Sequence, residues 1–124
     1  MGEKILLVDD EPNILLSLEF LMKRAGYEVS TATNGEIALE KVSQLPPDLI
    51  LLDINMPILN GYQVCERIRE TPQWSHIKII LLTAKGRDVE RQKGLAMGAD
   101  AYISKPFSNQ ELIELVTATL AVNS

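Results

Sequence analysis

The chain has 124 residues, of which 46% are hydrophobic and 23% are charged, and 12 Lys and Arg against 17 Asp and Glu give a net charge of −5. We interpret residues 1–124 as one globular domain, large enough to need neither disulfides nor structural zinc, and the single cysteine, Cys65, cannot pair within the chain. The acidic balance argues against direct nucleic-acid binding and no apolar run approaches the roughly 18 residues of a membrane span, so we expect a cytoplasmic protein without membrane contact.

The first half of the chain predicts two strands, each followed by a helix. Residues 5–8 form a continuous apolar run, typical of a strand covered on both faces, whereas residues 27–32 alternate as in an edge strand. Between them one helical stripe, ended by Gly26, consists of Ile14, Leu15, Leu18, Leu21, Met22 and Ala25. The second helix begins with a capping-box pattern at 33–36 and is broken by Pro46 and Pro47.

The second half repeats this alternation three times. Residues 49–52 and 79–82 are again continuous apolar runs, while residues 101–104 are half polar and favour an edge strand. Two helical stripes consist of Gly61, Val64, Cys65 and Ile68, and of Leu112, Ile113, Val116 and Leu120. Residues 108–111 match a capping box, and residues 87–97, ended by Gly98, have the weakest stripe and form the helix that we predict to be most mobile. His76 lies in a polar loop and is interpreted as a solvated side chain, and Cys65 as a core thiol.

Strict alternation of strand and helix predicts a parallel sheet with five helices on its two faces and right-handed crossovers. Central strands one, three and four, with strands two and five at the edges, allow the order 2-1-3-4-5, although periodicity alone does not fix it. That order is the flavodoxin-like one, in which ligands bind beyond the carboxyl ends of the strands.

Polar residues follow four of these strands where the strands end. Because the carboxyl ends of parallel strands share one edge, we expect Asp9, Asp10 and Asp53 to converge there with Thr83 and Lys105. Two carboxylates about 5 Å apart repel by roughly 3 kcal/mol at an effective dielectric near 20, so either some are protonated or a cation lies among them. Oxygen ligands alone favour Mg²⁺, completed by phosphate oxygens, and such a site suits phosphoryl transfer to an aspartate.

These residues carry a resemblance to a known family. The pattern resembles the receiver domain of two-component response regulators from about Lys4 to Leu120, through the matching residues Asp9-Asp10, Asp53 with Asn55-Met56-Pro57 and Gly61, Thr83-Ala84, Tyr102 and Lys105-Pro106-Phe107. The resemblance implies that Asp53 accepts a phosphoryl group from a sensor histidine kinase, a phosphotransfer protein or a small phosphodonor. It also implies a site that binds Mg²⁺ directly through Asp10 and Asp53, through water at Asp9 and through the backbone carbonyl of Asn55.

The resemblance assigns roles around the phosphoryl group as well. Lys105 would pair with it, the Thr83 hydroxyl and the Ala84 backbone N–H would donate to it, and the bond before Pro106 would be cis. Tyr102 would turn inward as Thr83 moves, which would change the surface of the fourth helix, fifth strand and fifth helix for a downstream effector. Two positions that tune phosphoryl lifetime in the family correspond to Asn55 and Lys85.

Each residue also has an ordinary structural interpretation. Asp10 could cap the helix that Pro12 opens, Thr83 could simply end a strand, Lys105 could be a solvated loop residue, and Tyr102 a half-buried aromatic. Two other functions fit less well. A phosphatase of the haloacid dehalogenase type has the Asp53-Ile54-Asn55 spacing but would need an acid at Asn55, and a flavodoxin-like electron carrier would need a phosphate loop where the acidic run 9–11 lies. Whether the domain acts alone or belongs to a longer regulator or hybrid kinase stays open.

Overall fold

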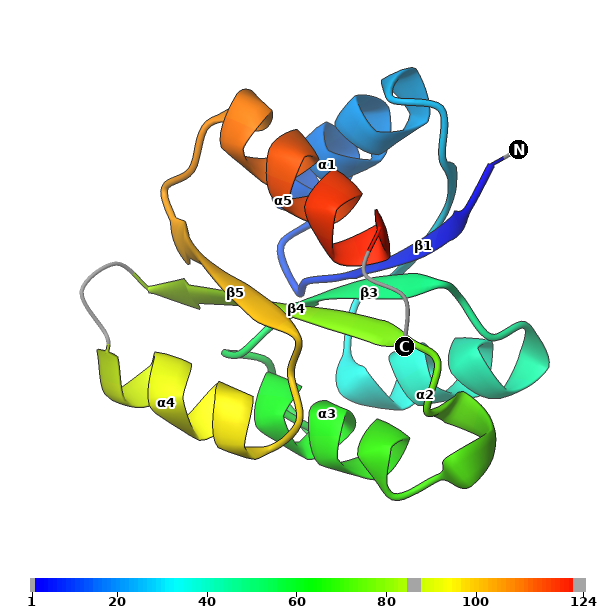
Figure 1. Ribbon diagram of the computed structural model, residues 1–124, viewed down its shortest axis with the longest axis vertical. Coiled ribbons are helices and arrows are strands. Elements are labelled where there is room, and N and C mark those ends of the chain that lie inside the picture. The colour runs from blue at the N-terminus through cyan, green and yellow to red at the C-terminus, as the bar shows by residue number, and fades with distance from the viewer. Residues whose placement is uncertain (1, 85–87, 122–124) are drawn as a thin grey trace.

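A computed structural model describes residues 2–84 and 88–121 of the chain. Strands alternate with helices throughout, with one short 3₁₀ turn, η1, before the fourth strand (Figure 1). The elements are β1 (Lys4–Val8), α1 (Pro12–Arg24), β2 (Glu28–Ala32), α2 (Gly35–Gln44), β3 (Leu49–Asp53), α3 (Gly61–Arg69), η1 (Pro72–Trp74), β4 (Lys78–Ala84), α4 (Asp88–Ala96), β5 (Ala101–Lys105) and α5 (Asn109–Ala121).

The five strands form one parallel sheet in the order β2-β1-β3-β4-β5, which confirms the predicted flavodoxin-like topology. Helices α1 and α5 cover one face of this sheet, and α2, α3 and α4 cover the other (Figure 1). All five residues of β3 are buried, as expected for a central strand with helices on both sides. Since β1 and β3 are neighbours with Val8 opposite Leu52, the residues that follow both strands emerge side by side.

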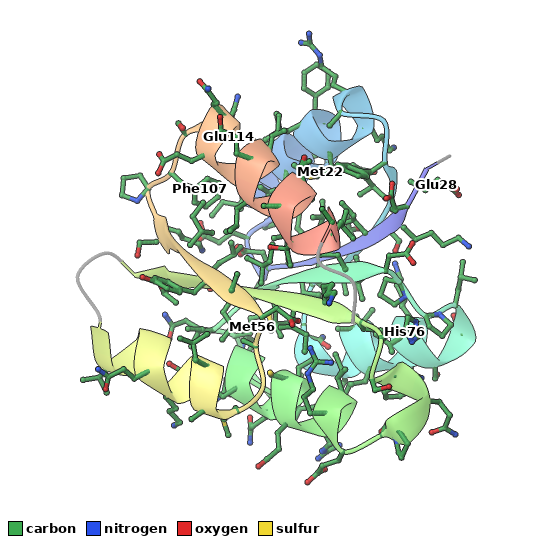
Figure 2. The ribbon with its side chains drawn as sticks, viewed as in Figure 1. Met22, Glu28, Met56, His76, Phe107 and Glu114 are labelled. Carbon is green, nitrogen blue, oxygen red and sulfur yellow. The ribbon has the colours of Figure 1, made fainter. Side chains whose placement is uncertain are left out.

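Two apolar cores lie on either side of the sheet. One, beneath α1 and α5, includes Leu15, Leu18 and Met22, and Met22 points from α1 into this core (Figure 2). The other, beneath α2, α3 and α4, includes Val64, Cys65, Ile68 and Tyr62, so the predicted stripe of α3 is confirmed. The stripe of α1 is narrower than the prediction, because Ala25 at its end is exposed.

Helix ends are close to the positions that the sequence predicts. Gly26 and Gly98 follow α1 and α4 with φ angles of 98° and 102°, a backbone region that favours glycine. The capping box at Ser108 and Glu111 is present in both directions. The box predicted at 33–36 is wrong in its register, since the cap of α2 is Asn34, whose side chain accepts from the Ile37 N–H at 2.9 Å.

Other features of the described chain complete the fold. The fourth helix, predicted from the weakest apolar stripe, is present as α4. Arg87, its expected first residue, lies outside the described residues. The mobility expected of this helix stays a prediction. His76 is exposed, as expected (Figure 2). Within residues 2–84 and 88–121, no helix combines the length and the apolar character required to cross a bilayer.

Gly61 joins α3 directly to the end of β3. Its N–H donates to the Ile54 carbonyl at 3.0 Å, and a Cβ atom at this position would lie 2.5 Å from the Asp53 carbonyl oxygen and 2.8 Å from the Ile54 Cα. Both neighbours are backbone atoms of a buried strand end and cannot rotate away. Gly61, the first residue of α3, is therefore held in close contact with the backbone of Asp53 and Ile54.

We predict that Gly61→Ala lowers the free energy of unfolding by about 2–3 kcal/mol, because the added methyl group overlaps the backbone of β3. Urea denaturation measures this change. Gly26→Ala is the matched control, because no atom lies within 4 Å of its added Cβ and only the positive φ opposes the substitution. That control is expected to cost about 1 kcal/mol, and equal losses in the two variants would contradict the close-contact explanation.

Candidate functional site

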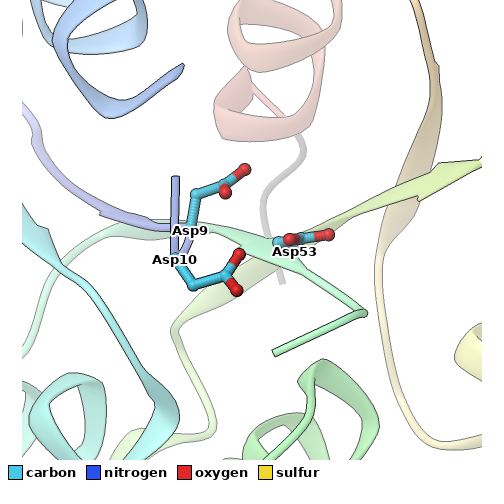
Figure 3. Close-up of side chains that lie close together, drawn as sticks. All are labelled: Asp9, Asp10 and Asp53. Atoms are coloured by element: carbon cyan, nitrogen blue, oxygen red, sulfur yellow. The ribbon is translucent and has the colours of Figure 1, made fainter. Parts of the chain in front are cut away.

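Three carboxylates gather beyond the carboxyl ends of β1 and β3. Asp9 and Asp10 follow β1, and Asp53 is the last residue of β3. One oxygen from each carboxylate lies within 4.8 Å of the other two, and the three side chains lie close together (Figure 3). Asp9 and Asp53 are buried while Asp10 is exposed, so two carboxylates of the cluster are shielded from solvent and the third is accessible to it.

Asp9 is fully buried but has polar partners. Its Oδ1 accepts a hydrogen bond from the Glu11 N–H at 2.9 Å, and its Oδ2 lies 3.3 Å from Lys105 Nζ. The Glu11 N–H lies at the start of α1, where a negative charge is favourable. The interpretation of Asp10 as the cap of this helix is wrong, since the cap residue is Glu11 and no side chain caps it.

Lys105 brings the positive charge to the cluster. Its Nζ lies 3.3 Å from Asp9 Oδ2 and 3.6 Å from Asp53 Oδ1, so one ammonium group contacts two carboxylates at once. The Asn55 N–H also donates to Asp53 Oδ1, at 3.3 Å. The predicted convergence of Asp9, Asp53 and Lys105 is thus observed, and the Lys105–Pro106 peptide bond is cis.

The surroundings shift the proton affinities of two of these groups. Burial raises the pKa of Asp53 to about 6, with smaller contributions from Asp9 and Asp10, against the opposing effect of Lys105 and of the Asn55 N–H. Burial alone would lower the pKa of Lys105, but the Asp53 and Asp9 carboxylates outweigh it, so that pKa is raised. Lys105 is therefore charged near neutral pH. Asp53 gains or loses its proton at a pH of about 6.

Thr83 lies at the end of β4 but its hydroxyl contacts β5. The hydroxyl is 3.5 Å from the Ile103 carbonyl and 3.4 Å from the Ser104 hydroxyl, and Asp53 pairs in the sheet with Leu82, one residue earlier. Ser104, a residue that sequence reasoning did not single out, is thus the side-chain neighbour of Thr83. Its place at the end of the predicted edge strand, directly before Lys105, is the signal in the sequence that could have identified it.

The remaining predicted residues lie around this group. Ala84 is the last residue of β4 and is opposite Lys105 in the register, and Tyr102 on β5 is half-buried against the core beneath α3 and α4. Lys85 lies outside the described residues. Asn55 is exposed and follows Asp53 by two positions.

A strained turn borders the site and was not predicted. In the loop between β3 and α3 the Leu59 N–H donates to the Pro57 carbonyl at 2.8 Å, which encloses Ile58 at a φ of 72°. A β-branched residue rarely adopts a positive φ, and the Ile58 side chain is 66% exposed. The loop that leaves Asp53 is therefore held tightly, with one apolar side chain in solvent.

These residues can hold a small, hard cation and an anion beside it. The cluster offers only oxygen atoms, from a rigid sheet edge, which is the donor set that Mg²⁺ accepts. Two carboxylates, buried and held beside a single ammonium group, leave excess negative charge that a divalent cation would offset. Asp10 is the exposed carboxylate, so the cluster is accessible to solvent on the side of this residue.

Comparison with known proteins gives one family. A family model described as the response regulator receiver domain matches residues 5–117. The chain is 44% identical over 120 residues, 97% of its length, to the alkaline phosphatase synthesis transcriptional regulatory protein PhoP of Bacillus subtilis (strain 168). It covers 49% of that relative and spans about half the length of the curated relatives that it matches.

Solved structures with the same fold agree with this match. The chemotaxis response regulator CheY4 of Vibrio cholerae superposes with a TM-score of 0.91 at 32% identity, over 96% of this chain and 99% of that one. The receiver domain of sensor histidine kinase PA1611 from Pseudomonas aeruginosa PAO1 superposes with a TM-score of 0.89 at 30% identity, over 98% of this chain and 100% of that one. That structure has a magnesium ion coordinated in its active site cleft.

We predict that Asp53→Asn stabilises the metal-free protein above neutral pH. The folded pKa of Asp53 is about 6 against an ordinary value of 3.8, so the stability supplied by the protonated carboxyl is complete below pH 3.8 and is lost as the pH rises through 6. Asparagine keeps the neutral form at every pH, and two pKa units correspond to about 3 kcal/mol. Urea unfolding with a chelator present, from pH 4 to pH 8, measures the difference.

The difference between variant and wild type is expected to be near zero at pH 4 and to grow to about 1–3 kcal/mol at pH 8. Glu114→Gln, on the exposed side of α5, is the control and should show no such growth. A constant difference across the pH range would contradict a raised pKa of Asp53.

Proposed function

Because the chain belongs to the response regulator receiver domain family, we propose that it accepts a phosphoryl group on Asp53 in phosphorelay signal transduction. The single observation that carries the proposal is the cluster itself. Asp9, Asp10 and Asp53 lie within 4.8 Å of one another, and Lys105 contacts two of them. The donor we propose is a sensor histidine kinase, a phosphotransfer protein or a small phosphodonor.

The transfer forms one bond and breaks one. An oxygen of the ionised Asp53 carboxylate bonds to phosphorus, and the bond from phosphorus to the donor's histidine nitrogen, or to the oxygen of a small phosphodonor, breaks with its electron pair on the donor. Since the pKa of Asp53 is about 6, this carboxylate is mostly ionised at neutral pH. The domain itself thus supplies the groups that promote its own phosphorylation and dephosphorylation.

Three groups of the chain would hold the transferred oxygens. Lys105 already lies 3.6 Å from Asp53 Oδ1 and would pair with the phosphoryl group. The Ala84 backbone N–H and the Thr83 hydroxyl come from the end of β4, beside Asp53 on β3, and would donate hydrogen bonds to it. These donors stabilise the charge that develops on the phosphoryl oxygens during transfer.

The same site would hold Mg²⁺, which when bound would neutralise phosphoryl charge and orient the donor. Asp10 and Asp53 would bind it directly, Asp9 through water, and Asn55 through its backbone carbonyl. The oxygen-only donor set supports this assignment, as does the magnesium ion coordinated in the receiver domain of PA1611.

Phosphorylation would change the surface of α4, β5 and α5. Thr83 would leave the Ile103 carbonyl for the phosphoryl group, and Tyr102 would turn into the space behind it. A downstream effector would then bind the altered face. We propose that residues 1–124 work as one such domain in the cytoplasm, where the buried, unpaired Cys65 stays reduced.

We predict that acetyl phosphate with Mg²⁺ adds one acid-labile phosphoryl group per chain, and that Asp53→Asn abolishes it because the acceptor oxygen is gone. Intact-protein mass spectrometry measures the added mass. Glu114→Gln, which removes an exposed carboxylate on α5 that is hydrogen-bonded to Gln110, should label like the wild type. Steady release of phosphate from many ester substrates would favour the aspartyl phosphatase instead.

We predict that Asp10→Ala weakens Mg²⁺ binding at least tenfold, measured by isothermal titration calorimetry, because the exposed member of the cluster is the ligand that a hydrated cation meets first. Removing one of three carboxylates lowers the negative charge of the site as well. Glu114→Gln again serves as the control. Undiminished affinity in Asp10→Ala would contradict the ligand assignment.

A further inference from the structure

Helix α4 has little apolar contact with the rest of the domain. Among its residues whose side chains are described, only Gly94 is buried, while Val89 is 79% and Leu95 41% exposed. A helix that packs through a glycine buries little apolar area, so other contacts decide where it lies. Among the side chains that the structure describes, two groups of contacts are present, one at the carboxyl end of α4 and one in its middle.

The carboxyl end of α4 is fixed by hydrogen bonds from α3. Arg69 Nε donates to the Gly98 carbonyl at 2.8 Å, and Arg69 NH2 donates to Asp100 Oδ2 at 2.8 Å. The Cys65 thiol donates to the Met97 carbonyl at 3.4 Å, and burial raises the pKa of this thiol to about 11, so it remains a donor. Asp100 also accepts from the Ile79 N–H at 2.7 Å, which joins the same turn to β4.

The middle of α4 rests on one aromatic ring. Lys93 Nζ lies 4.6 Å from the centre of the Tyr62 ring, and a Cβ atom on Gly94 would lie 2.3 Å from Leu81 Cδ1 and 3.8 Å from Tyr62 Cε1. Tyr62 is buried, whereas Lys93 is exposed. A cation–π contact with an exposed lysine is weaker than the charged hydrogen bonds at the carboxyl end, so the middle of α4 is the part that can release first.

Tyr62 also connects this contact to the phosphoryl site. It follows Gly61, which is fixed within close contact of the Asp53 carbonyl and Ile54. A change in the backbone around Asp53 therefore reaches the base of Tyr62 through one peptide unit. The ring of Tyr62 in turn lies beside Lys93 and Gly94 on α4.

We propose that Tyr62 and Lys93 form a latch that sets the position of α4, with Arg69 and Asp100 as the fixed end about which the helix pivots. Tyr62 and Lys93 are positioning residues, and the inference rests on the proposed function of Asp53. The latch is closed in the arrangement in which the Thr83 hydroxyl faces Ile103, so it stabilises that arrangement against the phosphorylated one.

The latch predicts how an exposed substitution alters the site. Losing a cation–π contact at an exposed position shifts an equilibrium about two- to fivefold. If the free chain mostly has the latch closed, Lys93→Gln lowers the dissociation constant for beryllofluoride, a phosphoryl mimic, by the same factor. Lys93→Arg keeps a cation over the ring and should leave the affinity unchanged.

The experiment measures beryllofluoride binding with saturating Mg²⁺ by following amide chemical shifts of α4. In Lys93→Gln we expect tighter binding, and the free Gly94 and Leu95 signals displaced along the line toward their beryllofluoride-bound positions. Lys23→Gln on α1 is the matched control, because it removes the same charge from an exposed lysine, paired with Glu19, on the other face of the sheet. It should change neither reading.

Two results overturn the latch. Unchanged affinity and unchanged α4 shifts in Lys93→Gln, with a wild type that binds beryllofluoride, would refute it and leave the proposed function intact. Equal effects of Lys93→Gln and Lys93→Arg would also refute it, since the cation over the ring would then be irrelevant. Failure of the wild type to bind beryllofluoride would instead refute the proposed function, and the latch with it.

Discussion

The properties of the site follow from one unfavourable interaction, the repulsion among three carboxylates held at one end of the sheet. Burying Asp9 and Asp53 beside each other is costly, because charges in a poorly solvated site repel strongly and lose hydration. A single ammonium group, Lys105 Nζ, compensates two of them at 3.3 and 3.6 Å. The deficit of positive charge that remains makes the site receptive to a divalent cation. Burial, with smaller contributions from Asp9 and Asp10, raises the pKa of Asp53. The fold tolerates this cost because its two apolar cores and buried central strands stabilise the rest of the domain.

The order of the strands explains why these residues can meet. Asp9 and Asp53 are neighbours because β1 and β3 pair directly, but Lys105 arrives from β5, with β4 in between. A long, flexible side chain can span that distance, whereas a shorter cation could not. Thr83 and Ala84 are the last two residues of β4, the strand that lies between β3 and β5 in the sheet. The ends of β1, β3, β4 and β5 thus each contribute a group to the site, and the parallel sheet is needed to bring these groups together.

Much of this arrangement follows from sequence because it depends on local pattern and on strand ends. The continuous run of β3 predicted a central strand, and Asp53 at its end predicted a rim position. Features that depend on which atoms compete for a hydrogen bond were not predictable. Asn34 rather than Thr33 caps α2, and the Thr83 hydroxyl turns to Ile103 and Ser104 rather than to the site. The turn at Ile58 was missed because its residue type disfavours the φ of 72° that the loop imposes.

The weakness of the contacts around Thr83 accounts for how a single phosphoryl group could reorganise the domain. Its hydroxyl lies 3.5 Å from the Ile103 carbonyl and 3.4 Å from Ser104, longer than the usual range for hydroxyl hydrogen bonds. A charged acceptor on Asp53 offers a shorter and stronger bond, so exchange of partners is favourable. The middle of α4 is held by the contact of the exposed Lys93 with one aromatic ring. The charge interaction proposed at the site is thus stronger than the contacts that hold Thr83 and Lys93. In the proposed mechanism, that imbalance would let phosphorylation of Asp53 alter the surface at α4 without disturbing either apolar core.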